Sequence, residues 1–449
     1  MNTVTALTAL TVAPIREGFF HSPIWRIILT VVLVLILLYI LGIVSYSIYK
    51  NRKLLDTPDN QARIRNERLS ELNAYSGAFQ MKPSFDSSMS ATNVPQNQKL
   101  LINTAVQGVR LTGYLGPYSY GMFDVDNGVR LALTTGARCL VLEIDYNEDT
   151  SEPRLIYLAQ GIKYSLNEGS LLAASKSIAA RAFASDGDGS PDTLRNDPLI
   201  VVTYLLNAPS ETRDYLKYLG KIAQQLQPLT PHLLGQTSQG DFRRQTLESQ
   251  LFFQPPSIFS RKIIHLCNAD TSMLRNLSAY NIQGQIGPDQ DLDLMVHARL
   301  YAKESPCPLG ITSTPTESKT AAAVLTTPTY WLTIPPERKQ QAVNDTKRAW
   351  TLVLEPNPDQ DTMTSENLLN IHKEYGIHCM PFSLADVKPK QDKWIGQKQG
   401  SGSSSGLFAR IAWRVKEAPL RFVPPEPIPI KIPSPQTDAG QGRIPSPSL

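Results

Sequence analysis

Two acidic residues, Glu143 and Asp145, end an apolar run within the segment GARCLVLEIDYNE at residues 136–148. In a β-strand, side chains at positions i and i+2 project from the same face, so both carboxylates are expected to point the same way. Such a pair can help to hold a divalent cation, because calcium binds through oxygen ligands. It can equally be the polar rim where a buried strand reaches the surface. The sequence leaves both interpretations open.

The elements that must position this pair alternate along the chain. Apolar runs predict strands, and amphipathic segments predict helices at 210–226 and 365–376. The strands are expected at 138–146, 198–207, 261–268, 349–355 and 377–382, with shorter candidates at 108–115, 154–159 and 295–301. About eight strands with intervening helices over roughly 290 residues predict an α/β fold, a single (β/α)8 TIM barrel. A doubly wound open sheet is the alternative, but no glycine-rich phosphate loop follows a strand.

In such a barrel the carboxyl ends of the strands form the functional face. Glu143 and Asp145 fall at such an end, and His265 and His297 sit in strands where either could face the barrel interior. The candidate site residues fall into three groups. Candidate metal ligands are Glu143 and Asp145, candidate substrate-binding residues are Arg110, Tyr114 and Tyr204, and secondary acid–base candidates are His265 and His297. His372, His378 and Cys379 could approach a metal, but polar packing is the favoured interpretation, since a helix and the next strand separate them.

The stretch NGVRLALTTGARCLVLEIDYNEDTSEPRLIY, residues 127–157, resembles the X-region of phosphatidylinositol-specific phospholipases C. In that family a helix leads into a Gly-x-Arg turn and a strand that ends in Glu-x-Asp. The segments DPLIVVTYLL and LFFQPPSIFSRKIIHLCN are similar to later strands of the family in the same order, and WRVKEAPLRFVPP is similar to its closing stretch. The resemblance covers residues 100–270 and implies a phospholipase-C-like barrel.

The resemblance also implies a catalytic apparatus that this chain lacks in part. Family members use two histidines for proton transfer and phosphate stabilisation, and calcium-dependent members add an Asn, the Glu-x-Asp pair and a further Glu. Neither 111–121 nor 154–163, where the histidines should fall, contains one. Tyr204 or Leu205 stands where the further Glu is expected, and only Glu143 and Asp145 match. Since a positioned acid or base supplies about 10²–10⁴-fold in rate, we expect the reaction to be lost.

A membrane anchor is the clearest prediction outside the barrel. Ile27–Val44 is uncharged and apolar, long enough with its flanks to cross a bilayer, and too long for a signal peptide. More Lys and Arg follow it than precede it, which places the barrel on the cytoplasmic side. The expected organisation is an N-terminal tail (1–23), a transmembrane helix (24–49), a stalk (50–97), the barrel (98–422, with a flexible loop at 396–406) and a proline-rich disordered tail (423–449).

These patterns predict a single-pass membrane protein whose degenerate barrel binds a lipid or a partner. The alternative is an active metal-dependent phosphodiesterase acting on a phosphoinositide or related lipid. The expected partners are the bilayer, a phospholipid head group and a protein that binds the proline-rich tail. A net charge of +4 gives no reason to expect nucleic acid. No cofactor is expected, apart from Ca²⁺ if the barrel is active.

Overall fold

The computed structural model describes residues 23–55, 57–76, 84–90, 92–159, 162–184, 196–237, 240–241, 250–303, 322–355, 364–386, 406–408 and 411–425. Most of the predicted tail at 1–23, most of the loop at 396–406 and most of the proline-rich tail at 423–449 lie outside these residues. The chain divides into two compact units, Met1–Glu67 and Arg68–Leu449.

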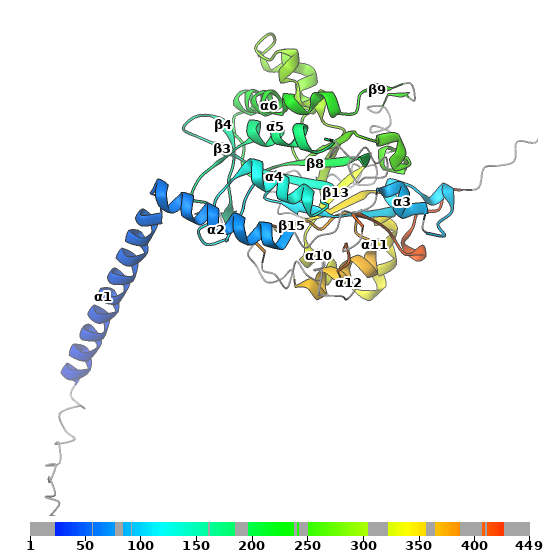
Figure 1. Cartoon of the computed structure of the whole chain (residues 1–449). Coiled ribbons are helices and arrows are strands. Elements are labelled where there is room, and N and C mark those ends of the chain that lie inside the picture. Colours follow the sequence, from blue (N-terminus) through cyan, green and yellow to red (C-terminus); the bar gives the residue numbers. More distant parts are fainter. Residues whose placement is uncertain are drawn as a thin grey trace, which may run out of the picture. The chain divides into compact units, whose positions relative to one another are not determined.

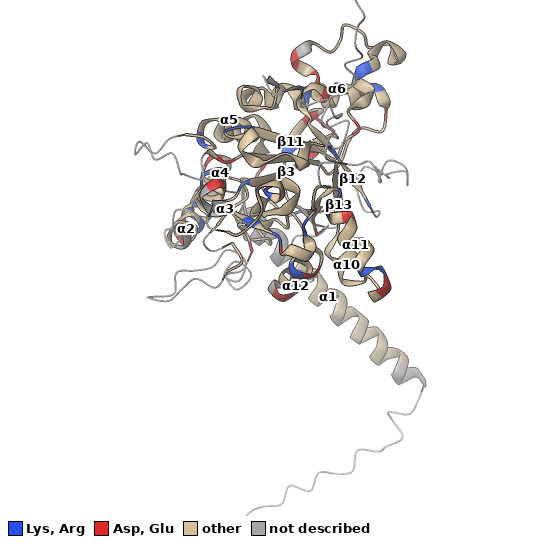
Figure 2. Cartoon of the chain, turned by 90° about the vertical axis from the view of Figure 1, so that its right-hand side faces the viewer, with Lys and Arg blue, Asp and Glu red and all other residues tan. Residues whose placement is uncertain are grey.

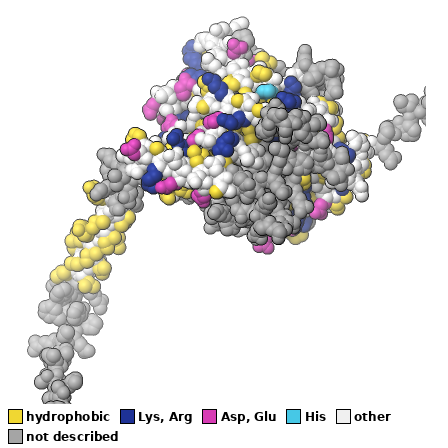
Figure 3. All heavy atoms as spheres, viewed as in Figure 1, with side chains coloured by type: hydrophobic (Ala, Val, Ile, Leu, Met, Phe, Trp, Pro, Cys, Tyr) yellow, Lys and Arg dark blue, Asp and Glu magenta, His cyan; other side chains and the backbone are white. Residues whose placement is uncertain are grey.

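The first unit contains one long apolar helix, α1 (Pro23–Leu55). Its segment Ile27–Tyr46 is long and apolar enough to cross a membrane, and the described side chains there are exposed. Figure 3 shows this stretch as an almost continuous apolar surface. The helix lies near the N-terminus, and its length and composition fit either a membrane anchor or a signal sequence. A second helix, α2 (Pro58–Ser76), crosses the boundary between the two units.

The second unit is an α/β fold built on a mostly parallel sheet (Figure 1). Each pair of neighbours in its main row is parallel. In spatial order this row is β14 (Trp350–Val353), β13 (Ala323–Thr326), β12 (Ala298–Ala302), β11 (Ile263–Cys267), β8 (Leu199–Leu205), β3 (Cys139–Asn147), β2 (Gly108–Arg110) and β15 (Phe382–Ser383).

The two ends of this row meet. A parallel bridge joins Leu352 in β14 to Cys379, three residues before β15. The N–H of Val353 donates to the carbonyl of Cys379 at 2.9 Å, and the N–H of Cys379 donates to that of Thr351 at 3.2 Å. The parallel strands among the described residues therefore close into a ring, and the line between β14 and β15 is called the seam below.

The strands are buried on both faces, which explains why they read as continuous apolar runs. Alternate residues belong to two separate cores. Within β3, Cys139 and Val141 belong to the core inside the ring, whereas Leu140 and Leu142 pack toward the helices. Figure 1 shows α4, α5 and α6 on one side of the ring and α10, α11 and α12 on another. These helices are α4 (Val125–Thr134), α5 (Leu171–Arg181), α6 (Thr212–Leu226), α10 (Pro328–Leu332), α11 (Lys339–Thr346) and α12 (Ser365–Tyr375).

Smaller elements complete the unit. The first and last of its described strands, β1 and β16, pair antiparallel, with Thr104 opposite Val415. Two helices, α3 (Phe85–Ser90) and α8 (Leu292–Met295), are short. The remaining strands are β1 (Thr104–Val106), β16 (Trp413–Val415), β4 (Glu152–Leu155), β5 (Leu158–Ala159), β6 (Ile162–Lys163), β7 (Gly169–Ser170), β9 (Gln236–Thr237) and β10 (Gly240–Asp241). The 3₁₀ helices lie at 96–98, 101–103, 227–232, 251–253, 256–259, 272–280, 288–290, 336–338 and 418–420.

The structure differs from the sequence-based expectation at two strands. The segment 154–159 forms no ring strand, because β4 pairs antiparallel with β3 as a hairpin and β5 pairs only with β6. The eighth strand of the ring is instead β13, which lies between β12 and β14 and which the sequence analysis missed. Strand β13 has only four residues, too few for a clear pattern.

Candidate functional site

The carboxyl ends of the parallel strands form one edge of the ring, called the mouth here. Arg110 ends β2, and Glu143 lies in the neighbouring strand β3. The two side chains form a bidentate ion pair, with Nε to Oε1 at 2.8 Å and Nη2 to Oε2 at 3.1 Å. Their side chains are only 5% and 4% exposed. A charge-assisted fork of this kind occupies both carboxylate oxygens of Glu143.

The same guanidinium reaches across the seam. Nη1 of Arg110 donates to the backbone carbonyl of Glu355, just after β14, at 2.6 Å. Strand β15 lies between β2 and β14 in the ring, so Arg110 spans the edge of the mouth from β3 to β14. Burial by itself would lower the pKa of Arg110, but the attraction and hydrogen bonds of Glu143 raise it. The guanidinium therefore remains charged.

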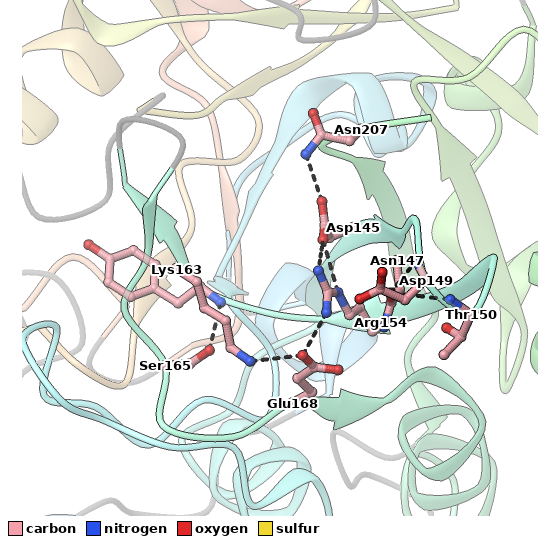
Figure 4. Close-up of polar contacts among 10 residues, drawn as sticks. Asp145, Asn147, Asp149, Thr150, Arg154, Lys163, Ser165, Glu168 and Asn207 are labelled. Carbon is pink, nitrogen blue, oxygen red and sulfur yellow. Dashed lines mark hydrogen bonds and ion pairs between the residues drawn. The ribbon is translucent and has the colours of Figure 1, made fainter. Parts of the chain in front are cut away.

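Asp145 is held by a second arginine (Figure 4). Its Oδ2 accepts from Nε of Arg154 at 3.0 Å, and its Oδ1 accepts from Nδ2 of Asn207 at 2.6 Å. Arg154 lies opposite Asp145 in the β3–β4 hairpin and also contacts Glu168 at 2.6 Å. Lys163 binds the same oxygen of Glu168 at 2.8 Å. Asp145 thus begins a row of alternating charges along the rim of the mouth.

Tyrosines complete the mouth around Arg110. Tyr204 lies in register with Glu143 on β8 and belongs to the inner core. The hydroxyl of Tyr118 donates to Oδ1 of Asp386 at 2.6 Å. Oδ2 of Asp386 accepts a hydrogen bond from the backbone N–H of Ser383 at 2.7 Å. Burial, followed by the charge of Asp386, raises the pKa of Tyr118 well above its usual value. This tyrosine is therefore protonated at neutral pH.

Tyr114 lies away from this group. It is fully buried among Phe123 and Tyr157 in the outer core, and its hydroxyl donates to the carbonyl of Pro117 at 2.7 Å. The chain turns sharply before it, since Leu111 has a left-handed φ of 48°. A branched residue adopts this conformation only at an energetic cost, which the surrounding packing must offset. Strain is thus stored directly after Arg110.

The two secondary histidine candidates face the helices and not the mouth. Ile264 and Leu266 belong to the inner core, so the side chain of His265 between them points to the opposite, outer face of the strand. It pairs with Val201, and Val201 with Leu140, three residues before Glu143. Three residues of strand correspond to about 10 Å. The structure does not bring these histidines to the Glu143–Asp145 pair.

Both histidines are instead fully used within the fold. Nδ1 of His265 lies 3.1 Å from the carbonyl of Met295, and Nε2 lies 3.0 Å from the hydroxyl of Thr203. Nδ1 of His297 accepts from the N–H of His265 at 2.9 Å. Burial lowers the pKa of His265 to about 3 and that of His297 to about 4. Both are uncharged at neutral pH.

The donor set at the mouth does not resemble a calcium site. Calcium takes six to eight oxygen ligands, whereas each candidate carboxylate here already binds an arginine. In the described part of the chain, no group of three or more His, Cys, Asp or Glu side chains could hold a metal ion. The sequence analysis did not identify Arg154, Asp386 or the carbonyl of Glu355 as members of the mouth. Only tertiary structure brings these residues together.

No family model and no curated protein matches this sequence. Solved structures are similar to it at low identity. PLC21 from L. pealei has a TM-score of 0.46 and 15% identity, covering 73% of this chain and 40% of its own. A calcium-dependent phosphoinositol-specific phospholipase C from a Pseudomonas species has a TM-score of 0.38 and 11% identity, covering 72% and 97%.

A third structure is the Ca²⁺-dependent phosphatidylinositol-specific phospholipase C from Streptomyces antibioticus, with a TM-score of 0.36 and 10% identity. It covers 57% of this chain and 82% of its own. The chain spans about two fifths of the length of the L. pealei and S. officinalis PLC21 proteins. The strand order and the closed seam described above define this chain's fold independently.

Proposed function

We propose that this chain is a single-pass membrane protein whose (β/α)8 barrel has the phospholipase C architecture but not the family's activity. It acts as a non-catalytic binding or structural protein held at a bilayer. The observation that carries the proposal is the position of Arg110. Its guanidinium takes both oxygens of Glu143 and reaches the carbonyl of Glu355, so the carboxylate oxygens that a metal ion would need are already bound by the chain's own side chain.

The proton-transfer groups support the same conclusion. The reaction implied by the resemblance needs an acid and a base near neutrality. The histidines nearest in the barrel wall, His265 and His297, lie on the outer face with strongly lowered pKa values. Tyr118 at the mouth has a raised pKa and is a poor base. The residues gathered at the mouth therefore suit a fixed polar surface better than a catalytic centre.

The membrane assignment rests on α1. A helix whose apolar side chains are exposed over twenty residues, Ile27–Tyr46, is stable in a bilayer and costly in water. Basic residues are more numerous after the span than before it, which favours a barrel on the cytoplasmic side. A glycosylation acceptor engineered into the 396–406 loop should stay unmodified in a eukaryotic membrane system. Efficient glycosylation there would reverse the orientation.

Activity measurement tests the central proposal. Full-length protein in nanodiscs that contain phosphatidylinositol should release no water-soluble inositol phosphate above background, with or without Ca²⁺. Glu143→Gln is the matched comparison, because it removes the charge but keeps the size of the side chain. Calcium-dependent cleavage that Glu143→Gln abolishes, while the variant remains folded, would show an active phosphodiesterase and overturn the proposal.

A further inference from the structure

A buried lysine and histidine contact each other at the opposite end of the barrel from the mouth. His378 lies four residues before β15, and Lys416 directly follows β16. The distance between Nζ of Lys416 and Nε2 of His378 is 2.7 Å. Lys416 is 2% exposed and His378 is fully buried. The mouth and the proposed function involve neither residue.

The other contacts of His378 determine which of its nitrogens carries the proton. Nδ1 accepts a hydrogen bond from the backbone N–H of Thr351 at 2.8 Å, so Nδ1 has no hydrogen. In a neutral imidazole the hydrogen must then be on Nε2. Nε2 lies 2.9 Å from the carbonyl of Ile102, which agrees with a donor at this position. Lys416 therefore approaches an N–H donor and not a lone pair.

An ammonium group has three donors and no lone pair, so a charged Lys416 would face this N–H donor to donor. An uncharged amine resolves the conflict. Its lone pair and the carbonyl of Ile102 share Nε2–H of His378 in a three-centre hydrogen bond, and one of its own N–H groups donates to the carbonyl of Thr346 at 3.2 Å. This assignment is chemically consistent with every contact described for the pair.

The charged groups around the pair favour the same state. They are cationic: Lys347 at the end of α11 acts on Lys416 itself, while Lys373 on α12 and Arg414 on β16 act on His372, which interacts with His378. The carboxylates nearest in sequence do not offset them, since Glu374 pairs with Lys339 and Glu417 is exposed. Burial, followed by the charge of Lys347, lowers the pKa of Lys416 well below its usual value. Burial likewise lowers the pKa of His378 well below its usual value.

We propose that Lys416 is held as an uncharged amine hydrogen-bonded to His378, and that this pair is an acid-sensitive latch on the seam of the barrel. His378 binds Thr351 of β14 through its ring, and its carbonyl accepts from the N–H of Val106 in β1 at 2.7 Å. Lys416 joins the end of α11 to the same point. Protonation of either side chain places two donors face to face and separates these elements.

The sign of the pH dependence follows from the proton count. An unfolded lysine is protonated below about pH 10.4, whereas the folded latch keeps Lys416 neutral. The unfolded state therefore binds the additional proton, and stability is lost as the pH falls from about 10. His378 adds to this loss below about pH 6.5, where an unfolded histidine becomes charged. The latch therefore stabilises the fold most at alkaline pH, and this stabilisation decreases as the pH falls.

The test is equilibrium denaturation of the full-length protein in detergent micelles, followed by tryptophan fluorescence between pH 7.5 and 9.5. One additional proton bound on unfolding changes the unfolding equilibrium constant tenfold per pH unit. Lys416→Met should reduce the pH slope of the wild type by this one proton. Lys176→Met, on an exposed position of α5, is the matched control and should leave the slope unchanged. Parallel curves for Lys416→Met and the wild type would refute the latch.

A second variant keeps the test decisive if Lys416→Met folds poorly. Arginine remains protonated at all these pH values, so Lys416→Arg forces a charge into the latch. At pH 7.5 it should raise the unfolding equilibrium constant at least tenfold more than Lys416→Met does. If Lys416→Arg matches the wild type while Lys416→Met is strongly destabilised, Lys416 is a charged group in the folded protein and the proposal is wrong.

Discussion

The Arg110–Glu143 pair allows a quantitative test of how the mouth is built. Both side chains are almost completely buried and bound to each other by two hydrogen bonds. Arg110→Met removes the cation and leaves a buried, unpaired carboxylate. Breaking a buried pair in this way costs about 3–5 kcal/mol, and the lost donor to the carbonyl of Glu355 adds about 1 kcal/mol. With the usual entropy of unfolding for a domain of this size, Tm should fall by roughly 5–8 °C.

Replacing both partners should be far less damaging. In the double variant Arg110→Met with Glu143→Met, no charge remains to be buried, and apolar side chains of similar volume fill the same space. We expect its stability to lie within about 2 kcal/mol of the wild type, so that the two substitutions couple strongly in a double-mutant cycle. Urea denaturation of all four proteins gives this coupling. Additive effects, or a loss below about 1 kcal/mol for Arg110→Met, would refute the pairing that underlies the proposed inactivity.

Three further predictions concern other parts of the chain. Burial raises the pKa of Asp197 to about 7, so the folded state holds a proton that the unfolded state has lost. Stability should then fall as the pH rises from about 4 to about 7, and Asp197→Asn should remove this loss in urea denaturation, worth up to about 4 kcal/mol above pH 7. Identical pH curves would contradict this. A Cβ at Gly128 would lie 2.5 Å from the Cα of Gly113, so Gly128→Ala should cost about 1–3 kcal/mol, whereas an unchanged denaturation midpoint would argue against this close packing. Deleting residues 1–50 should yield a soluble, folded barrel, and persistent membrane association of that fragment in high salt and alkali would contradict a single anchor.

The sequence was informative where strands are long and buried. The runs at 138–146, 198–207 and 261–268 correspond to β3, β8 and β11, and the helix expected at 210–226 corresponds to α6. Their residues are apolar on both faces, and such a pattern depends little on what packs against it. Short elements carried too little signal. The hairpin strand β4 resembled a ring strand, because pairing direction cannot be read from its four residues.

The same limit applies to the mouth. The shared face of Glu143 and Asp145 follows from the two-residue repeat of a strand, and both side chains do lie near the carboxyl end of β3. Their partners could not be inferred in this way. Arg110 lies 33 residues from Glu143, and the carbonyl that it also binds lies 245 residues away in the sequence. Only closure of the ring brings these groups together.

The pairing of β1 with β16 has a consequence for the synthesis of this chain. Thr104 and Val415 are partners although 311 residues separate them. At about 5–20 residues per second, a ribosome needs roughly 15–60 s to make the intervening segment. During that interval β1 lacks its partner strand β16, and unpaired strand edges of this kind promote aggregation. Nascent chains that stop before residue 411 should therefore remain bound to chaperones, while chains that include β16 are released in the folded state.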